Sequence, residues 1–191
     1  MGADLVMLGP PGSGKGTQAA RLTEKYRIPH IATGDIFRAQ AESGTPLGAE
    51  VKAHLDRGEL VPDELAIDVI RHRLAQPDAQ HGFVLDGFPR TVPQAQALDA
   101  MLAELGRPLD AVLYLDVDRQ TLIDRMLHRA QVEQRSDDQP DVIRHRIDVF
   151  LEQTAPLVDY YRRQSKLRLI DGTRAPEEVA AATDAVLASL G

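Results

Sequence analysis

Short apolar stretches alternate along the chain with longer stretches in which apolar residues recur every three or four positions. A short apolar run between polar or glycine-rich segments is typical of a buried strand, whereas a spacing of three and four is typical of an amphipathic helix. The pattern predicts extended segments at residues 3–8, 29–31, 83–85, 111–115 and 167–170. It predicts helices at residues 15–26, 36–42, 47–57, 63–74, 93–105, 119–129, 141–163 and 176–190.

This alternation predicts an α/β fold in which a parallel sheet is covered by helices on both faces. In such folds, ligands bind at the carboxyl ends of the strands. Within the helix at 93–105, we expect one face to be buried, formed by Leu98, Met101, Leu102 and Leu105. Because the chain has 191 residues and no long linker, we expect a single domain.

Two segments fit this core poorly. Residues 32–61 form a helical insertion between strands, and residues 130–140 form a polar excursion between two helices. Both emerge next to strand carboxyl ends, where mobile segments over a binding site are expected.

The composition narrows the possible partners. A formal net charge of −7 argues against a nucleic-acid partner, which requires a broad basic surface. The absence of cysteine excludes disulfides, thiol nucleophiles and thiolate zinc sites. No apolar run reaches membrane-spanning length and no secretory signal pattern is visible, so we expect no membrane partner and a cytoplasmic location. Most of the 22 basic residues are arginines, which suit bidentate contact with phosphate.

The sequence GPPGSGKGTQ at residues 9–18 lies directly between the first predicted strand and the first predicted helix. A strand, a glycine-rich turn and a helix N-terminus in this order surround an anion with backbone N–H groups, so the segment predicts a phosphate-binding loop. The side chain of Lys15 would reach along the phosphates as a point charge. The loop positions expected to bind are Gly12, Ser13, Gly14, Lys15, Gly16 and Thr17.

A second motif begins where the predicted strand at 83–85 ends in a carboxylate, Asp86. In phosphate-loop enzymes an aspartate at this place orients magnesium or its water shell. The chain continues as DGFPR at residues 86–90. There Gly87 and Pro89 would hold an irregular backbone while Arg90 points toward the phosphates.

Both motifs resemble those of adenylate kinases and other nucleoside monophosphate kinases, in particular the loop variant in which Gly16 separates Lys15 from Thr17. The resemblance extends to the two ends of the insertion, which read ATGD at 32–35 and ELVP at 59–62. It implies a P-loop three-layer sandwich with a central five-stranded parallel sheet. It also implies an AMP-binding insertion at 32–61 and a short lid at 129–140.

The resemblance implies roles for individual residues. For AMP these residues are Thr33, Arg38, Glu59, Leu60, Val61, Gly87, Phe88, Pro89, Arg90, Gln94, Arg135 and Arg146. For ATP it adds Arg129 and Arg174 to the loop positions. Phosphoryl transfer is assigned to Lys15, Arg90, Arg129, Arg135 and Arg146, and Mg²⁺ to Asp86 and Thr17 through water. The amide of Gln94 suits two hydrogen bonds with an adenine edge. Arg125 and Arg144 are interpreted as ordinary surface arginines.

The implied reaction is the reversible transfer of a phosphoryl group from ATP to AMP, giving two ADP, by a monomer without structural zinc. A kinase for UMP, CMP or another monophosphate is the nearest alternative, disfavoured by Thr33 and Gln94. A GTPase-like switch would usually use an asparagine to recognise guanine, and the chain contains no asparagine. A nucleotide-binding protein without catalytic activity is the third possibility, disfavoured by Lys15, Asp86 and the arginines.

Overall fold

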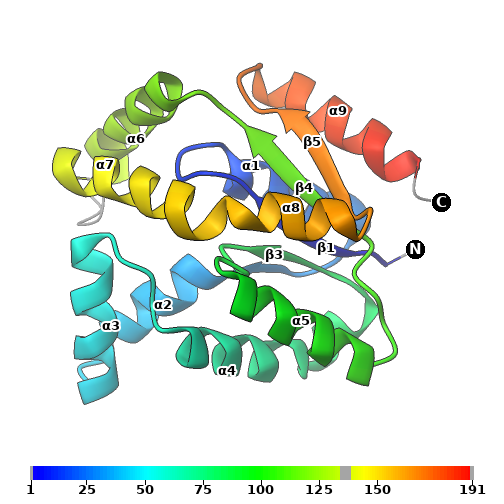
Figure 1. Ribbon diagram of the computed structural model, residues 1–191, viewed down its shortest axis with the longest axis horizontal. Coiled ribbons are helices and arrows are strands. Elements are labelled where there is room, and N and C mark those ends of the chain that lie inside the picture. Colours follow the sequence, from blue (N-terminus) through cyan, green and yellow to red (C-terminus); the bar gives the residue numbers. More distant parts are fainter. Residues whose placement is uncertain (1, 134–138, 190–191) are drawn as a thin grey trace.

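The computed structural model describes residues 2–133 and 139–189 of the chain, and the α/β fold expected from the sequence is confirmed. Its strands are β1 (Asp4–Leu8), β2 (His30–Ala32), β3 (Phe83–Asp86), β4 (Ala111–Asp116) and β5 (Leu167–Asp171). They form one five-stranded sheet in the order β2-β3-β1-β4-β5 (Figure 1), and every neighbouring pair is parallel. The strand that enters the glycine-rich loop, β1, therefore lies at the centre of the sheet.

The α-helices connect these strands. They are α1 (Lys15–Tyr26), α2 (Thr33–Ala41), α3 (Pro46–Arg57), α4 (Asp63–Leu74), α5 (Val92–Glu104), α6 (Arg119–Glu133), α7 (Pro140–Val149), α8 (Pro156–Arg163) and α9 (Pro176–Ala188). A 3₁₀ helix at Pro77–His81 precedes β3, and a π-helical turn at Phe150–Thr154 joins α7 to α8. Among the residues that the structure describes, no helix combines the length and the apolar character needed to cross a membrane.

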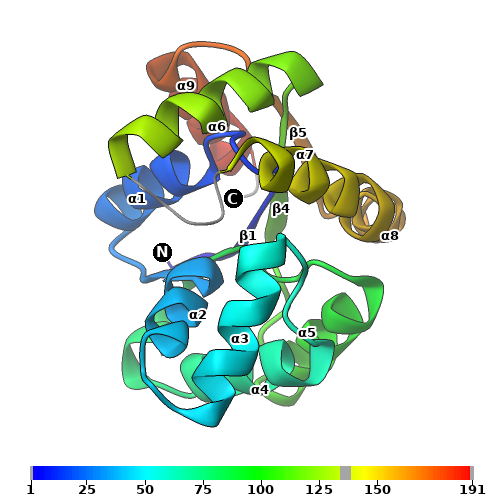
Figure 2. The same ribbon diagram turned by 90° about the vertical axis from the view of Figure 1, so that its left-hand side faces the viewer.

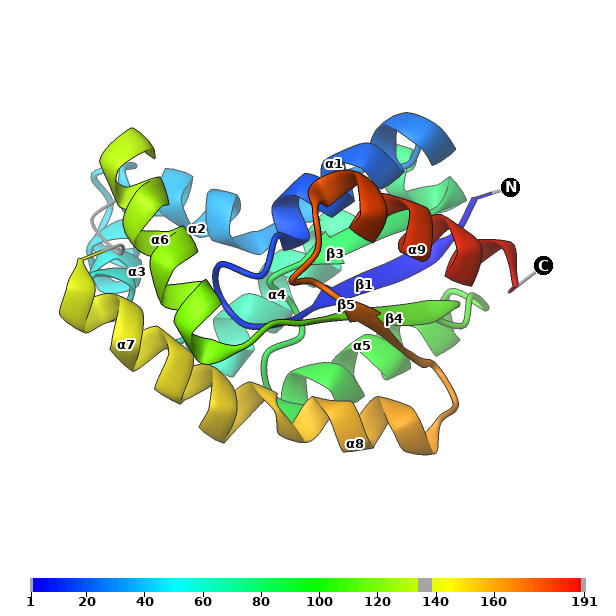
Figure 3. The ribbon, with the colours of Figure 1, turned by 90° about the horizontal axis from the view of Figure 1, so that it is seen from above.

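Helices cover both faces of the sheet, as Figure 3 shows, with α1 and α9 on one face and α4, α5 and α8 on the other. The alternation of side chains along β1 accounts for this arrangement. Leu5 and Met7 belong to the cluster that includes Leu22 of α1, whereas Val6 and Leu8 belong to the cluster on the opposite face. Because both faces are buried, β1 is apolar at four successive positions rather than at every second one.

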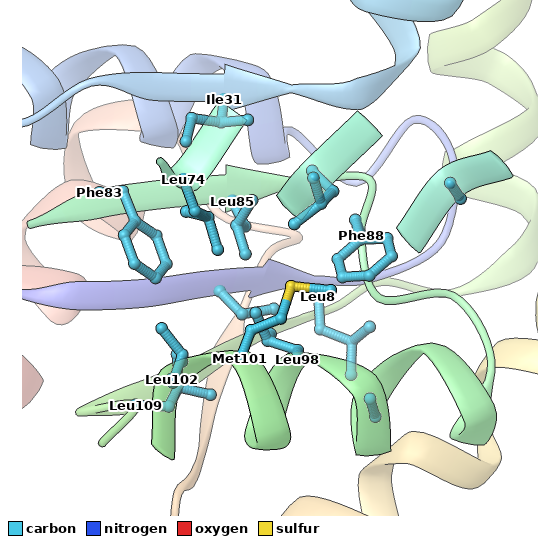
Figure 4. Close-up of a cluster of buried hydrophobic side chains, with 14 of the residues drawn as sticks. Leu8, Ile31, Leu74, Phe83, Leu85, Phe88, Leu98, Met101, Leu102 and Leu109 are labelled. Carbon is cyan, nitrogen blue, oxygen red and sulfur yellow. The ribbon is translucent and has the colours of Figure 1, made fainter. Parts of the chain in front are cut away.

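The larger cluster lies between the sheet and α5 (Figure 4). Phe83 and Leu85 of β3 contribute from the sheet, and Leu98 and Leu102 contribute from α5, each with no more than 1% of its surface exposed. Complete burial of one such side chain stabilises the fold by about 1.5–3 kcal/mol. This cluster fixes α5 against β3, and thereby fixes the segment that joins them.

Two sequence predictions about helices were wrong. Leu105 is 51% exposed, so the buried face of α5 comprises Leu98, Met101 and Leu102, and Leu105 caps the C-terminus of the helix. The single helix expected at 141–163 is interrupted by the π-helical turn. Pro156 has no N–H and its ring crowds the preceding turn, and there the N–H of Ala155 donates to the carbonyl of Phe150, five residues earlier, at 2.8 Å.

Candidate functional site

The carboxyl ends of three neighbouring strands meet at one edge of the sheet. Met7 of β1 is paired with Asp86 of β3, and Ala32 of β2 is paired with the same residue. The loop that follows β1, the carboxylate that ends β3 and the start of α2 after β2 therefore converge. This is the edge at which a parallel sheet is expected to bind ligands.

The glycine-rich loop has a positive φ at Gly9, Gly12 and Gly14, and the last two have the left-handed angles that favour glycine most clearly. Gly12 has a φ of 83° and Gly14 has a φ of 95°. At Gly12 a Cβ atom would also come within 2.8 Å of Cγ of Met126 and 3.0 Å of the carbonyl oxygen of Leu122, both on α6. The loop is thus packed closely under α6. It leads into α1, whose first N–H groups have no partner within the helix and attract anions.

Lys15, the first residue of α1, curls back over the loop. Its Nζ donates to the carbonyl oxygens of Gly9 at 2.9 Å and Pro10 at 3.0 Å. Burial lowers the pKa of Lys15 to about 8; the carboxylate of Asp86 opposes this shift, and the positive charges of nearby arginines add to it. Those arginines are Arg90, Arg146 and Arg129. An anion bound here would favour the charged form of the lysine.

Asp86 lies beside the start of α1, where the loop ends. Burial acts to raise the pKa of its carboxyl group, but a hydrogen bond from His30 and the charges of Lys15 and Arg90 outweigh this effect and hold the pKa below its usual value. Oδ2 of Asp86 lies 3.2 Å from Nε2 of His30. Asp86 is therefore an ionised acceptor in a largely enclosed position.

The residues at this edge suit Mg²⁺, which is held by one or two carboxylates, water and substrate phosphates rather than by a full protein cage. Asp86 and Thr17 both line the cleft, and both offer oxygen. A Cβ atom on Gly16 would lie 3.7 Å from Oδ2 of Asp86, so the start of α1 and the carboxylate are close neighbours. No group of three or more histidine, cysteine, aspartate or glutamate side chains able to hold a metal occurs within residues 2–133 and 139–189.

The cleft above the loop has a volume of about 390 Å³. It is lined by Pro11, Gly12, Gly14, Lys15, Gly16, Thr17, His30, Ala32, Gly34, Asp35, Arg38, Asp86, Gly87, Arg90, Arg125, Met126, Arg129 and Arg146. We call this hollow the loop cleft. It contains most of the positions that the sequence assigned to ATP and to phosphoryl transfer.

A second hollow, of about 70 Å³, lies between α2, α3 and the start of α5. We call it the side cavity. It is lined by Thr33, Gly34, Phe37, Arg38, Leu55, Gly58, Glu59, Leu60, Val61, Ala66, Gly87, Arg90, Gln94, Arg146 and Val149. Five residues line both hollows, namely Gly34, Arg38, Gly87, Arg90 and Arg146. The hollows are thus adjoining compartments with arginines at their junction.

The arginines at this junction come from separate elements. Arg38 lies on α2, where it is paired with Asp35, and Arg146 lies on α7. Arg90 follows β3 and donates from Nε to the carbonyl oxygen of Gly87 at 3.0 Å. The end of α3 approaches α7 closely (Figure 2), since a Cβ atom on Gly58 would come within 2.9 Å of Cγ of Arg146. Folding is therefore required to bring these charges together.

Some residues assigned from the sequence do not line either hollow. Phe88 is 1% exposed and belongs to the core, and Pro89 is buried beside it. Ser13 is 2% exposed, and its Oγ has no hydrogen-bond partner among the described residues. Arg174 is exposed and paired with Asp171 at 3.0 Å. Arg135 lies outside the described residues, as does part of the predicted lid.

Arg125 lines the loop cleft, although the sequence interpretation left it on the surface. Its Nη1 donates to the carbonyl oxygen of Gly172 at 2.9 Å, which links α6 to the turn after β5. The available signal was its spacing, because Arg125 and Arg129 are four residues apart and share one face of α6. Arg144, in contrast, is exposed as expected.

Known proteins match most of the chain. The family model described as adenylate kinase matches residues 7–166. A protein named adenylate kinase from Thermobifida fusca is 53% identical over 175 residues, covering 92% of this chain and 93% of the relative. One of the same name from a Nocardioides species is 51% identical over 177 residues, or 93% of each chain. Another, from Xanthomonas campestris, is 49% identical over 175 residues, covering 92% of this chain and 94% of the relative.

Proposed function

The chain belongs to the adenylate kinase family and is a phosphotransferase, and we propose that it transfers the terminal phosphoryl group of ATP to AMP in a reversible, Mg²⁺-dependent reaction that yields two ADP. The observation that carries this proposal is the pair of adjoining hollows whose shared wall contains Arg38, Arg90 and Arg146. Two bound nucleotides would meet with their phosphates at this wall. Such an arrangement suits a direct transfer between them.

The loop cleft is the proposed donor site. The N–H groups of residues 12–17 would surround the phosphates of ATP, and Lys15 would leave the carbonyls of Gly9 and Pro10 to contact them. Arg129 lines the same cleft from α6. Asp86 and Thr17 would hold Mg²⁺ through water, and this ion supplies charge neutralisation for the phosphates when it is bound.

The side cavity is the proposed acceptor site. Its walls combine apolar side chains, such as Phe37 and Val61, with the polar groups of Thr33 and Gln94, as expected for a purine base. The hydroxyl of Thr33 donates to the backbone carbonyl of Asp86 at 3.1 Å, which leaves its oxygen able to accept a further hydrogen bond. We assign the helical insertion at 32–61, which contains α2 and α3, to AMP binding. The lid assigned to 129–140 stays a prediction from the sequence.

The chemistry requires no general base. The phosphate of a nucleoside monophosphate is already anionic at pH 7, so no side chain must remove a proton from it. The side chains need only align two anions and stabilise the charge on the transferring group, and preorganised cations in an enclosed site do this effectively. Lys15, Arg90 and Arg146 are the cations that the proposal assigns to this task, together with Arg129 and Arg135.

Direct chromatographic measurement of ADP formation tests the proposal. ATP and AMP together should yield ADP with Mg²⁺ and none with EDTA, whereas CMP, UMP and GMP should be poor acceptors. Phosphorylation of CMP or UMP as fast as AMP would instead assign the protein to another acceptor. If no ADP forms with any monophosphate, the protein binds nucleotides without catalysing phosphoryl transfer.

The family resemblance also supports a monomer in the cytoplasm. Light scattering at working concentration should give a mass near 21.0 kDa with and without nucleotides. A mass of twice that value would contradict the monomer.

A further inference from the structure

The side-chain amide of Gln94 is held from two sides. Its Nε2 donates to Oδ1 of Asp63 at 2.8 Å, and its Oε1 accepts the backbone N–H of Arg90 at 2.8 Å. Gln94 is 2% exposed, yet it lines the side cavity. A primary amide has two N–H hydrogens and two oxygen lone pairs. One donor and one acceptor of Gln94 therefore remain for a ligand in the cavity.

These two contacts fix which end of the amide is nitrogen and which is oxygen. The carboxylate of Asp63 can only accept a hydrogen bond, and the N–H of Arg90 can only donate one. Turning the amide over would place its oxygen against the carboxylate and its NH₂ group against the N–H. Both contacts would then be repulsive inside a buried site, where unpaired polar groups are costly.

The orientation matters because two kinds of purine present opposite edges. Adenine has a donor at its 6-amino group beside an acceptor at N1, whereas hypoxanthine and guanine have an acceptor at O6 beside a donor at N1. An amide in one orientation complements the first edge, and the same amide turned over complements the second. We propose that Asp63 is a positioning residue that selects 6-aminopurine acceptors by holding the Gln94 amide in one orientation. This inference rests on the proposed use of the side cavity by AMP.

Asp63 is itself held in place. It is the first residue of α4, and its Oδ1 also accepts the hydroxyl of Thr91 at 2.9 Å. Thr91 is the N-cap of α5 and accepts the backbone N–H of Gln94 at 3.3 Å. The carboxylate thus joins the N-termini of α4 and α5 around the amide. If Asp63 only tied these two helices together, its replacement would lower the stability of the protein without changing the base preference.

The test is the variant Asp63→Asn, in which the new side chain has the same shape as the old one. The amide introduced by this substitution can present either its oxygen or its NH₂ group to Gln94, so only the N–H of Arg90 would still favour one orientation. The measured quantity is kcat/KM for AMP divided by kcat/KM for inosine monophosphate, which differs from AMP only at the base edge in question. One mismatched pair of base contacts changes discrimination by about tenfold to hundredfold. We expect this ratio to fall by about tenfold or more, through KM rather than kcat.

The matched control is Glu64→Gln. Glu64 is the next residue of the same helical turn, is exposed, and makes no side-chain hydrogen bond within the part of the chain that the structure describes. The substitution removes the same charge from the N-terminus of α4 without touching Gln94. The ratio should stay within about twofold of the wild-type value. A fall equal to that of Asp63→Asn would mean that helix charge, not amide orientation, sets the preference.

The possible outcomes separate this inference from the proposed function. If the wild-type protein does not phosphorylate AMP, the proposed function fails. If it does, but Asp63→Asn loses thermal stability and keeps the wild-type ratio, Asp63 is structural and the inference is overturned. A measurement on the wild-type protein covers the case in which the variant does not fold. AMP should shift the ¹⁵N-edited NMR signals of the Gln94 amide protons, and no shift with saturating AMP would overturn the inference.

Discussion

The affinity for ATP should fall as the pH rises through the pKa of Lys15. Burial lowers this pKa from 10.5 to about 8, so the ammonium loses its proton within the range of an ordinary binding experiment. Phosphates beside the ammonium favour the charged form and raise the pKa in the complex. Above pH 8, therefore, the protein must take up a proton in order to bind ATP, and the affinity weakens as protons become scarce.

The size of the effect follows from the fraction of protein with a charged Lys15. With a pKa of about 8, this fraction is roughly three quarters at pH 7.5 and about one tenth at pH 9. The apparent dissociation constant of ATP should thus rise about eightfold over this interval. The phosphates of ATP titrate mainly below pH 7.5 and contribute little to the change.

Calorimetry with ATP and EDTA, in buffers with different ionisation enthalpies, measures both affinity and proton uptake. At pH 8, binding should take up about half a proton per ATP. The control is Lys15→Met, which should bind ATP more weakly and without this pH dependence. In the wild-type protein, a constant affinity between pH 7.5 and 9 together with no proton uptake would refute the lowered pKa of Lys15.

The same variant should also separate catalysis from folding. Between pH 8 and 10.5, Lys15 keeps its proton in the unfolded chain but loses it in the native protein, so the native protein becomes more stable as the pH rises through this range. Below pH 8, Lys15 is charged in both states, and burial of its ammonium in the native protein opposes folding. Lys15→Met without nucleotide should therefore be at least as resistant to thermal unfolding as the wild type at pH 7. Its rate of phosphoryl transfer should fall by about 10²–10³.

Three further substitutions have defined outcomes. Leu98→Ala removes a side chain with 0% exposure, so urea unfolding should show a loss of about 2–5 kcal/mol in the free energy of unfolding. Gly87→Ala should destabilise the protein by more than about 1 kcal/mol, because φ is 87° and the new Cβ would come within 2.5 Å of Oγ1 of Thr33; an unchanged urea midpoint would contradict this. Arg125→Lys cannot reproduce the hydrogen bond from Nη1 to the carbonyl oxygen of Gly172. Steady-state kinetics should therefore show a severalfold higher KM for ATP and a nearly unchanged KM for AMP. Equal changes in both KM values would contradict a role of Arg125 in the donor site.

The sequence predicted best those features that depend on local order. The loop required glycines at fixed offsets between a strand and a helix, and Gly12 and Gly14 indeed have the positive φ angles that favour glycine. The helix expected at 15–26 has these bounds in the structure. Strand pairing then followed from chain order, because alternating strands and helices leave few topologies other than a parallel sheet.

The features that the sequence missed depend on partners far along the chain. Arg125 and Arg129 look alike in the sequence, but the acceptor for Arg125 is a backbone carbonyl at residue 172. Any residue offers such a carbonyl, so no side-chain pattern marks it. Gln94 was assigned from the resemblance to adenylate kinases, with support from the chemistry of its amide. Asp63, 31 residues earlier, could be connected to it only through the packing of α4 on α5.

The positive charges of the site have a consequence for the whole protein. Arg90, Arg129 and Arg146 each contribute to lowering the pKa of Lys15, which means that their positive charges repel its ammonium. This repulsion opposes folding, and the apolar clusters on both faces of the sheet offset it. A bound polyphosphate relieves the repulsion and adds its own binding free energy to stability. The thermal stabilisation produced by a nucleotide should accordingly grow with its number of phosphates, because each added phosphate neutralises more of the same cluster.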